Sequence, residues 1–295
     1  MVGQRPNGTG AAVRRPYVVH DRPLFFAHRG GSGLAPENTM MAFQQGMDLG
    51  ADALELDIQM TRDGEIVVIH DANVDRTTDG TGPVAGYTLD ALRRLDAGCR
   101  FTPDGGRTFP FRGRGLTIPT LRAVFEGYPA ARINIDLKES TPEREHRLWA
   151  LIQEFGAEDR TLVASGDLHA PIVRFREISG GRVSTSASAS EIRTFVLAAA
   201  VGAAGRLRPA YDALQVPISF RGVPVTRRGL VAAAHRHGLD VHVWTVDRRD
   251  AMERLLALGV DGIMTDRPDV LAEVFRGRGW LVAAPAGTTE PRDRR

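Results

Sequence analysis

The feature that most constrains the fold is a regular alternation of short apolar, β-rich runs with amphipathic helical patterns. Eight such runs are expected to be strands: Leu24–His28, Ala53–Asp57, Ile133–Lys138, Thr161–Ala164, Val183–Thr185, Ala213–Val216, Val241–Thr245 and Gly262–Thr265. Helical patterns follow most of them, at Glu37–Leu49, Pro142–Phe155, Pro171–Ile178, Glu191–Ala200, Arg227–His237, Arg249–Leu258 and Pro268–Phe275. This spacing is typical of parallel βαβ units, and eight units predict an α/β protein with a closed (β/α)₈ TIM barrel.

The length of the chain agrees with one barrel. It has 295 residues, and a single α/β barrel commonly takes about 250, so residues 23–276 are expected to form it. The stretch 71–117 is rich in Gly, Pro, Thr and Asp and breaks the alternation, apart from one short helix around 89–95. The second strand is expected to begin a hairpin, and this stretch indicates a small insertion after that hairpin. Residues 1–22 and 283–295 lack apolar periodicity and are expected to be disordered tails.

Composition and charge exclude several classes of protein. The single cysteine, Cys99, rules out a disulfide framework and a multi-cysteine zinc site. No apolar run is long enough to span a bilayer, so no stable membrane insertion is expected. The 38 basic and 36 acidic side chains nearly cancel and form no basic stripe, which argues against nucleic acid as a partner. The first 22 residues contain no apolar signal core, and a cytoplasmic location is therefore expected.

Polar side chains gather at the carboxyl ends of the predicted strands, where (β/α)₈ barrels place their catalytic groups. They are His28 and Arg29 after the first strand, Glu55 and Asp57 in the second, Asp136 and Lys138 in the third, and Trp244 in the seventh. The period of two within a strand places Glu55 and Asp57 on one face. It likewise places Asp136 and Lys138 on one face. Lys138 is the only lysine among 38 basic residues, which singles it out as a functional candidate.

A hairpin is expected to bring His70 to the same place. The Asp-Gly pair at 63–64 lies between two apolar runs and is a strong signal for a two-residue turn. With that turn, His70 lies directly across from Asp57, and Glu55 lies on the same face. His28 and His70 are then candidates for the general acid and general base of one site.

Three carboxylates, Glu55, Asp57 and Asp136, cannot all remain charged in a closed site without a cation. One divalent ion with oxygen ligands, Mg²⁺ or Ca²⁺, satisfies them, whereas zinc prefers nitrogen or sulfur. Arg29 and Lys138 beside such an ion suit a phosphate group. The alternative is a structural network in which the carboxylates pair with Arg29 or other arginines.

Short motifs recur in order along residues 24–275. They are His-Arg-Gly at 28–30, Ala-Pro-Glu-Asn-Thr at 35–39, Glu-Leu-Asp at 55–57, His-Asp at 70–71, Asp-Arg-Thr-Thr at 75–78, Leu-Asp-Ala-Gly at 95–98, Ile-Pro-Thr-Leu at 118–121, Trp-Thr-Val at 244–246 and Gly-Val-Asp-Gly-Ile-Met-Thr-Asp at 259–266. Together they resemble the glycerophosphodiester phosphodiesterase family of phospholipase C-like TIM barrels. The resemblance implies metal-dependent hydrolysis of small glycerophosphodiesters to sn-glycerol 3-phosphate and an alcohol, in lipid and glycerol metabolism.

The resemblance also assigns roles. It implies that His28 and His70 form the acid–base pair, that Glu55, Asp57 and Asp136 bind the metal, and that Arg29, Lys138 and Trp244 bind the substrate. The family usually has glutamate where this chain has Asp136, and the aspartate carboxylate reaches about 1.5 Å less far. Two alternatives stay open: phospholipase D-like hydrolysis of lysophospholipids or sphingolipids, and a non-catalytic barrel that binds phosphodiesters.

Overall fold

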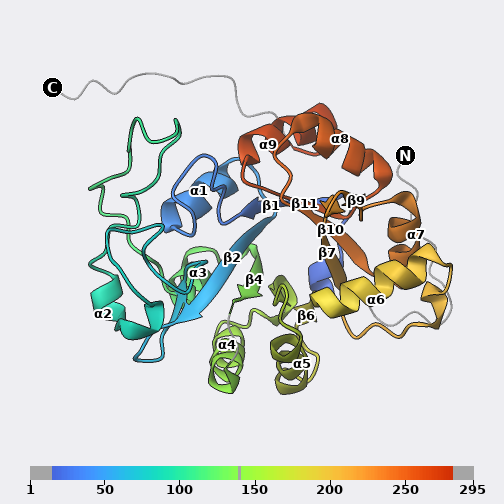
Figure 1. The fold of residues 1–295 in the computed structure, drawn as a ribbon, viewed down its shortest axis with the longest axis horizontal. Helices are drawn as coiled ribbons and strands as arrows, with labels where there is room; N and C mark the ends of the chain where they lie inside the picture. Colours follow the sequence, from blue (N-terminus) through green and yellow to red (C-terminus); the bar gives the residue numbers. More distant parts are fainter. Residues whose placement is uncertain (1–14, 139–140, 282–295) are drawn as a thin grey trace.

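A ring of eight parallel strands forms the centre of the computed structural model, which describes residues 15–138 and 141–281 (Figure 1). The strands are β1 (Leu24–His28), β2 (Ala53–Met60), β4 (Arg132–Leu137), β5 (Thr161–Ala164), β6 (Ser184–Thr185), β7 (Ala213–Pro217), β10 (Asp240–Trp244) and β11 (Gly262–Thr265). They are hydrogen-bonded in the order β6-β5-β4-β2-β1-β11-β10-β7. A parallel bridge between Ser186 and Ala213 joins the two end strands, so the predicted (β/α)₈ barrel is confirmed.

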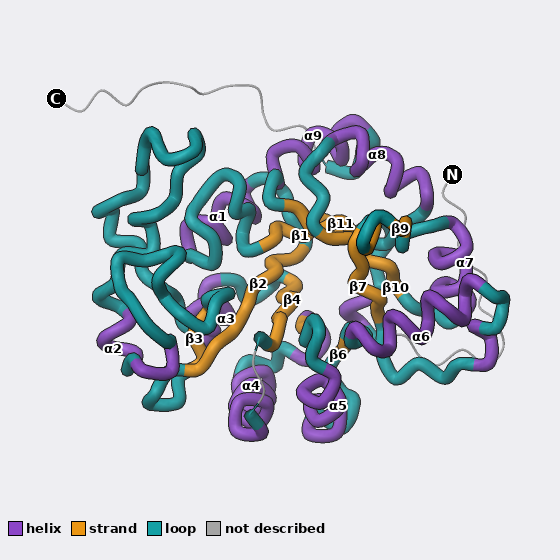
Figure 2. Tube along the Cα trace, in the orientation of Figure 1, coloured by secondary structure: helices purple, strands orange, loops and turns teal. Residues whose placement is uncertain are grey.

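Helices surround the strands on the outside (Figure 2). The barrel helices are α1 (Met40–Asp48), α3 (Leu121–Gly127), α4 (Pro142–Glu154), α5 (His169–Ile178), α6 (Ala189–Ala200), α7 (Arg228–Arg236), α8 (Arg249–Leu258) and α9 (Pro268–Gly277). The sequence patterns did not predict α3, which has only seven residues and directly follows the insertion. α1 begins later than predicted, because Thr39 caps it by accepting a hydrogen bond from the Ala42 amide (3.2 Å).

The core has two layers, separated by the strands. Leu54, Leu56 and Ile58 of β2 face outward and pack in one cluster with the surrounding helices. A smaller cluster, which includes Phe26 and Met264, fills the inside of the barrel. Because side chains alternate along a strand, Glu55 and Asp57, which lie between these outward residues of β2, face the inside of the barrel.

A plug formed by the start of the described chain closes the amino end of the barrel. Residues 15–22 were expected to belong to a tail, but they are folded, with a 3₁₀ turn, η1, at Pro16–Val18. Tyr17 is completely buried and packs in one cluster with Leu24 and Ala53, the first residues of β1 and β2. The apolar run around Tyr17 is too short to show any periodicity, which is why sequence patterns missed it.

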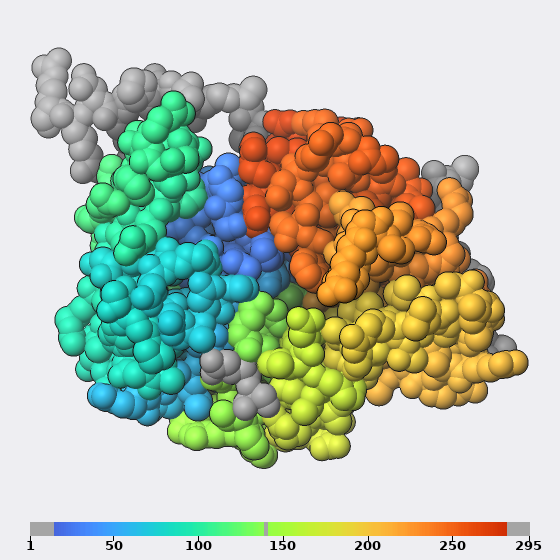
Figure 3. Space-filling model, in the orientation of Figure 1, coloured from blue at the N-terminus to red at the C-terminus, as the bar shows by residue number. Residues whose placement is uncertain are grey.

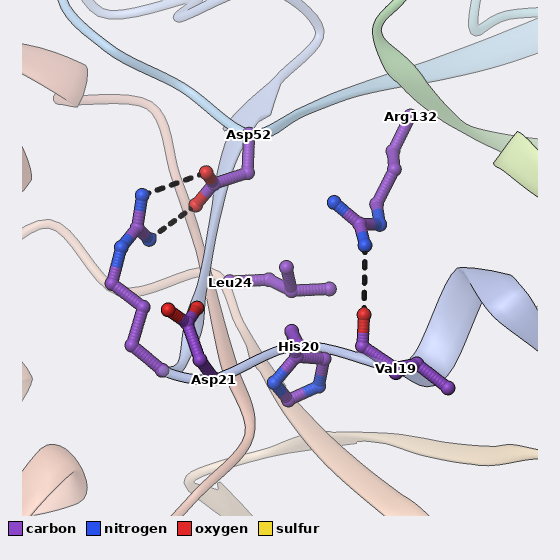
Figure 4. A pocket seen from close by; sticks show the side chains of 7 residues that line it. Val19, His20, Asp21, Leu24, Asp52 and Arg132 are labelled. Carbon is purple, nitrogen blue, oxygen red and sulfur yellow. Dashed lines mark hydrogen bonds and ion pairs between the residues drawn. The ribbon is translucent and has the colours of Figure 1, made fainter.

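A pocket of about 480 Å³ lies beside this plug (Figure 4). It is lined by Val19, His20, Asp21, Arg22, Leu24, Asp52 and Arg132. The Arg132 guanidinium donates a hydrogen bond to the carbonyl oxygen of Val19 (2.9 Å). None of the predicted site residues lines it, because they occupy the opposite, carboxyl end of the strands.

Residues 71–117, which were expected to form an insertion, share a small apolar core with the residues that flank them. It contains η2 (Val84–Gly86) and α2 (Leu89–Leu92), and it follows β3 (Ile66–Val68), which pairs antiparallel with β2. The core consists of Val67, Ile69, Val74, Val84, Leu92, Ala97 and Ile118. The insertion therefore packs against β3 and the adjoining chain, beside the mouth of the barrel (Figure 1).

A second hairpin, which sequence patterns did not predict, follows β7. It consists of β8 (Ser219–Phe220) and β9 (Val223–Pro224). Of the predicted tails, residues 1–14 and 283–295 lie outside the described residues. Within the described ranges, no helix has the length and apolar character needed to cross a membrane.

Candidate active site

The predicted carboxylates lie together at the carboxyl end of the barrel. The strand registers set His28 beside Glu55 and Asp57 beside Asp136. Glu55 and Asp57 are both buried and, by the alternation along β2, face the inside of the barrel. The period-two prediction for these side chains is therefore consistent with the observed geometry.

Lys138 joins two of the carboxylates directly. Its Nζ lies 2.6 Å from Asp136 Oδ2 and 3.0 Å from Asp57 Oδ1. Arg29 adds a second cation, with Nε 3.2 Å from Asp57 Oδ2. Burial alone would raise the pKa of Asp57, but the charges of Lys138 and Arg29 outweigh burial and lower it. Asp57 is therefore held in its ionised form.

The other two carboxylates are less well compensated. Burial and the charge of Asp57 raise the pKa of Glu55 to about 7. Burial also raises the pKa of Asp136, although Lys138 opposes this shift. The Oδ1 atom of Asp136 is buried and has no hydrogen-bond partner among the described residues. The site thus holds more negative charge than Lys138 and Arg29 neutralise.

The loop after β1 shapes the site with its backbone. Arg29 has a positive φ of 51°, and its amide donates a hydrogen bond to Glu55 Oε2 (3.0 Å). Gly30 follows with φ 84°, and a Cβ there would lie 2.7 Å from backbone and side-chain atoms of Ala42, so only glycine fits. Asn38, also at positive φ, donates from Nδ2 to Asp57 Oδ2 (3.0 Å). Sequence reasoning missed Asn38 as a site residue, although it belongs to the quoted 35–39 motif.

His28 is fixed by a residue from the other end of the chain. Its Nδ1 lies 2.6 Å from Asp266 Oδ1, and Ser32 donates to the same oxygen (2.5 Å). Its Nε2 lies 3.7 Å from Glu55 Oε2. Burial would lower the pKa of His28, but the charge of Glu55 and the hydrogen bond with Asp266 raise it to about 9. Asp266 therefore sets the orientation of the ring.

The predicted hairpin register is wrong. The Ile69 amide donates to the carbonyl oxygen of Asp57 (3.0 Å), so Asp57 faces Ile69 and not His70. The cause is a longer turn, because the Thr61 amide donates to the carbonyl oxygen of Glu65 (3.0 Å) and leaves three residues in the loop. A change of one residue in register reverses the face of every side chain on the second strand.

His70 still lies near the carboxylates, because β3 ends before it and the chain turns. Its charge helps to lower the pKa of Asp57 and opposes the rise in the pKa of Asp136. Its Nδ1 lies 2.5 Å from Asp71 Oδ1. Both histidines therefore have Nδ1 bound to an aspartate, which leaves Nε2 as the ring nitrogen for chemistry.

A chain of ion pairs links the His70 partner to the loop after β1. Arg76 donates to both oxygens of Asp71 (2.6 and 3.1 Å) and to both oxygens of Glu37 (2.7 and 2.8 Å). Glu37 in turn accepts from Arg29 Nη1 (2.9 Å). Hydrogen bonds from Arg76, together with the His70 hydrogen bond, lower the pKa of Asp71 to about 2. This network, from His70 to Arg29, ties the insertion to the barrel.

Trp244 ends β10 at the same end of the barrel and is 44% exposed, so it lies at the rim of the site. Within residues 15–138 and 141–281, no group of three or more His, Cys, Asp or Glu side chains is arranged as a metal centre. Instead, the ammonium group of Lys138 contacts Asp57 and Asp136.

Comparison with known proteins gives consistent matches. Residues 28–270 match the sequence model of the glycerophosphoryl diester phosphodiesterase family. A glycerophosphodiester phosphodiesterase of Caldanaerobacter subterraneus subsp. tengcongensis is 37% identical over 269 residues, which cover 88% of this chain and 100% of that protein. One from Bacillus subtilis is 33% identical over 291 residues, covering 90% and 91%. The crystal structure of a glycerophosphodiester phosphodiesterase from Agrobacterium tumefaciens covers 85% of this chain and 99% of its own, with TM-score 0.69 and 27% identity.

Proposed function

This chain belongs to the glycerophosphoryl diester phosphodiesterase family and acts as a glycerophosphodiester phosphodiesterase, and from this premise we propose how it does so. We propose that it uses a divalent cation, with His28 and His70 as its acid–base pair. The products are sn-glycerol 3-phosphate and an alcohol. The observation that carries this proposal is the placement of two histidines, each bound through Nδ1 to an aspartate, beside a cluster of buried carboxylates.

Glu55, Asp57 and Asp136 would hold the cation. Their donor atoms are all carboxylate oxygens, which suit Mg²⁺ or Ca²⁺. The Oδ1 atom of Asp136 supports a cation here, because it is a buried carboxylate oxygen with no hydrogen-bond partner among the described residues. When bound, the cation supplies positive charge that stabilises the phosphoryl oxygens of the substrate.

Arg29 and Lys138 bind the phosphate group. Both cations are already held against the carboxylates, so their side chains need little further ordering when the substrate arrives. Their charges offset the negative charge that builds on the phosphoryl oxygens. Trp244, at the rim, contacts the organic part of the diester.

The two histidines move the protons. One accepts a proton from the nucleophile, which is water or the 2-hydroxyl of the glycerol. The other donates a proton to the alkoxide oxygen as the phosphorus–oxygen bond of the alcohol breaks. The 2-hydroxyl route releases the alcohol and leaves a cyclic phosphate, which water then opens to sn-glycerol 3-phosphate. Asp266 and Asp71 hold His28 and His70 in orientation during these transfers.

The test is a product analysis. The purified protein should release sn-glycerol 3-phosphate and choline from glycerophosphocholine. Activity should disappear in EDTA and return when Mg²⁺ or Ca²⁺ is added in excess. Full activity in EDTA would contradict the cation, and release of glycerol and phosphocholine would contradict the assigned bond. Binding of the diester without any turnover would favour the non-catalytic alternative.

A further inference from the structure

Exposed apolar side chains gather on one part of the rim. Of the seven large hydrophobic side chains exposed in the described residues, four lie there: Ile218, Phe220, Val223 and Trp244. The first three belong to the β8–β9 hairpin, residues 218–226, which we call the rim hairpin. It continues from Pro217, the register partner of Trp244. Exposed apolar side chains that gather on neighbouring segments, unlike single exposed residues, are typical of an interaction surface.

The rim hairpin is preformed by its turn. Phe220 and Val223 face each other across the two strands. Arg221 and Gly222 form the turn, with φ values of 49° and 79°, as a type I′ hairpin requires. Two backbone amides beyond the turn donate to the carbonyl oxygen of Ile218 (3.0 and 3.2 Å). The apolar pair is therefore presented to solvent with little entropy left to lose on binding.

The rim hairpin also lies in a positively charged segment of the sequence. Residues 213–239 contain four arginines and no aspartate or glutamate. Arg221 lies with its guanidinium carbon 5.4 Å from the centroid of the Phe220 ring, so cation and apolar tip are adjacent. Among the described residues, Arg221, Arg227 and Arg228 form no ion pair, whereas Arg248, nearby in sequence, is paired. These three positive charges are available to a partner.

The position of the rim hairpin relates it to the active site. It follows the carboxyl end of β7, and the site lies at the carboxyl ends of β1, β2 and β4. Figure 3 shows this segment, in orange, at the front of the face viewed. A surface bound by the rim hairpin would therefore lie close to the mouth of the barrel.

We propose that the rim hairpin docks this enzyme on an anionic lipid surface. Aromatic side chains prefer the boundary between headgroups and acyl chains, and arginines are attracted to anionic headgroups. The combination of Phe220, Val223 and Trp244 with unpaired arginines matches both requirements. Docking would place the mouth of the barrel at the headgroups, where diesters of single-chain glycerophospholipids are found. The binding step does not depend on the chemistry of the proposed function.

The experiment is co-sedimentation of the full chain with vesicles. Wild type should bind vesicles of phosphatidylcholine mixed with phosphatidylglycerol, and should not bind vesicles of phosphatidylcholine alone. Phe220→Ser and Val223→Ser should each weaken the partition coefficient by about tenfold, from the apolar area lost. Arg221→Gln should weaken it by about fivefold, and high salt should weaken binding of wild type.

A matched control comes from α6, where Leu197 and Val201 are also exposed. Leu197→Ser and Val201→Ser should leave vesicle binding unchanged. Hydrolysis of glycerophosphocholine without vesicles should stay at the wild-type rate in the Phe220→Ser and Arg221→Gln variants, which shows that they are folded. The proposal is overturned if wild type ignores anionic vesicles, or if the α6 variants lose as much binding as the hairpin variants. Either result leaves the hydrolytic activity standing.

Discussion

Replacing Lys138 by methionine should destabilise the metal-free protein, and a divalent cation should restore the lost stability. The Lys138 ammonium contacts both Asp136 and Asp57, at 2.6 and 3.0 Å. Without it, the buried Asp57 carboxylate and the half-buried Asp136 carboxylate repel each other, and only Asp57 keeps a cation, Arg29. Breaking a buried ion pair costs about 3–5 kcal/mol. The Lys138 side chain is 24% exposed and Arg29 remains, so the expected loss is about 2 kcal/mol.

Thermal melting measures this loss. For a domain of this size, about 2 kcal/mol corresponds to a decrease in Tm of roughly 4–8 °C. The decrease should appear in EDTA and shrink in excess Mg²⁺ or Ca²⁺, because a cation bound to Glu55, Asp57 and Asp136 replaces the missing charge. Equal Tm values for wild type and Lys138→Met in EDTA would refute the reasoning.

Replacing Lys138 by arginine tests whether the site needs the shape of the lysine side chain as well as its positive charge. Lys138→Arg keeps the charge but puts a planar fork where a compact ammonium lies, and it should pair bidentately with Asp136. We expect kcat/KM to fall by about tenfold, roughly 1.4 kcal/mol. Arg248→Lys, at an arginine whose side chain is 81% exposed, is the matched control and should not change kcat/KM. Wild-type kinetics for Lys138→Arg would show that the site needs only a positive charge there.

Three further predictions concern the histidines and the aspartates that bind them. His28→Ala and His70→Ala should each lower kcat by about 100-fold or more while Tm changes by only a few degrees, as steady-state kinetics and melting would show. Asp266→Asn should lower kcat/KM by about tenfold and lower the pKa of His28, so that one limb of the pH profile moves to lower pH, whereas an unchanged profile would remove Asp266 from the orientation of His28. Asp240 is buried, and burial alone would raise its pKa. Hydrogen bonds with His20 and His242 lower this pKa instead. Its charge therefore stabilises the fold above the unfolded pKa of about 4, and this stabilisation is lost as the pH falls toward the folded value. Asp240→Asn should flatten the acid limb of unfolding free energy against pH in urea titrations.

The barrel and its strands could be predicted from local sequence patterns. Every strand of the barrel lies where an apolar, β-rich run predicts it, because buried parallel strands need such runs. The same logic placed Asp136 and Lys138 on one face at the carboxyl end of the third predicted strand, and they are in contact. α3 escaped detection because a helix of seven residues gives too short a periodic signal.

The finer parts of the site depend on contacts that no local pattern encodes. Asp266 binds His28 across 238 positions of sequence, and only closure of the barrel brings them together. The β2–β3 register depends on the loop at Thr61–Glu65, where the Thr61 hydroxyl accepts a hydrogen bond from the Glu65 amide (2.9 Å) and favours the longer turn. The Asp-Gly pair at 63–64 alone does not predict this hydrogen bond, and therefore does not predict the longer turn.

The plug at the amino end has a consequence for the order of folding. Tyr17 is synthesised before every strand of the barrel, yet the cluster that buries it includes Leu162, Ala213 and Met264 from β5, β7 and β11. Its binding site is therefore incomplete until the last strand has left the ribosome. Contacts between such distant positions are slow to form, because a long loop must close before they stabilise anything. Of the turns in the described residues, the one that is synthesised first is thus among the last to be buried.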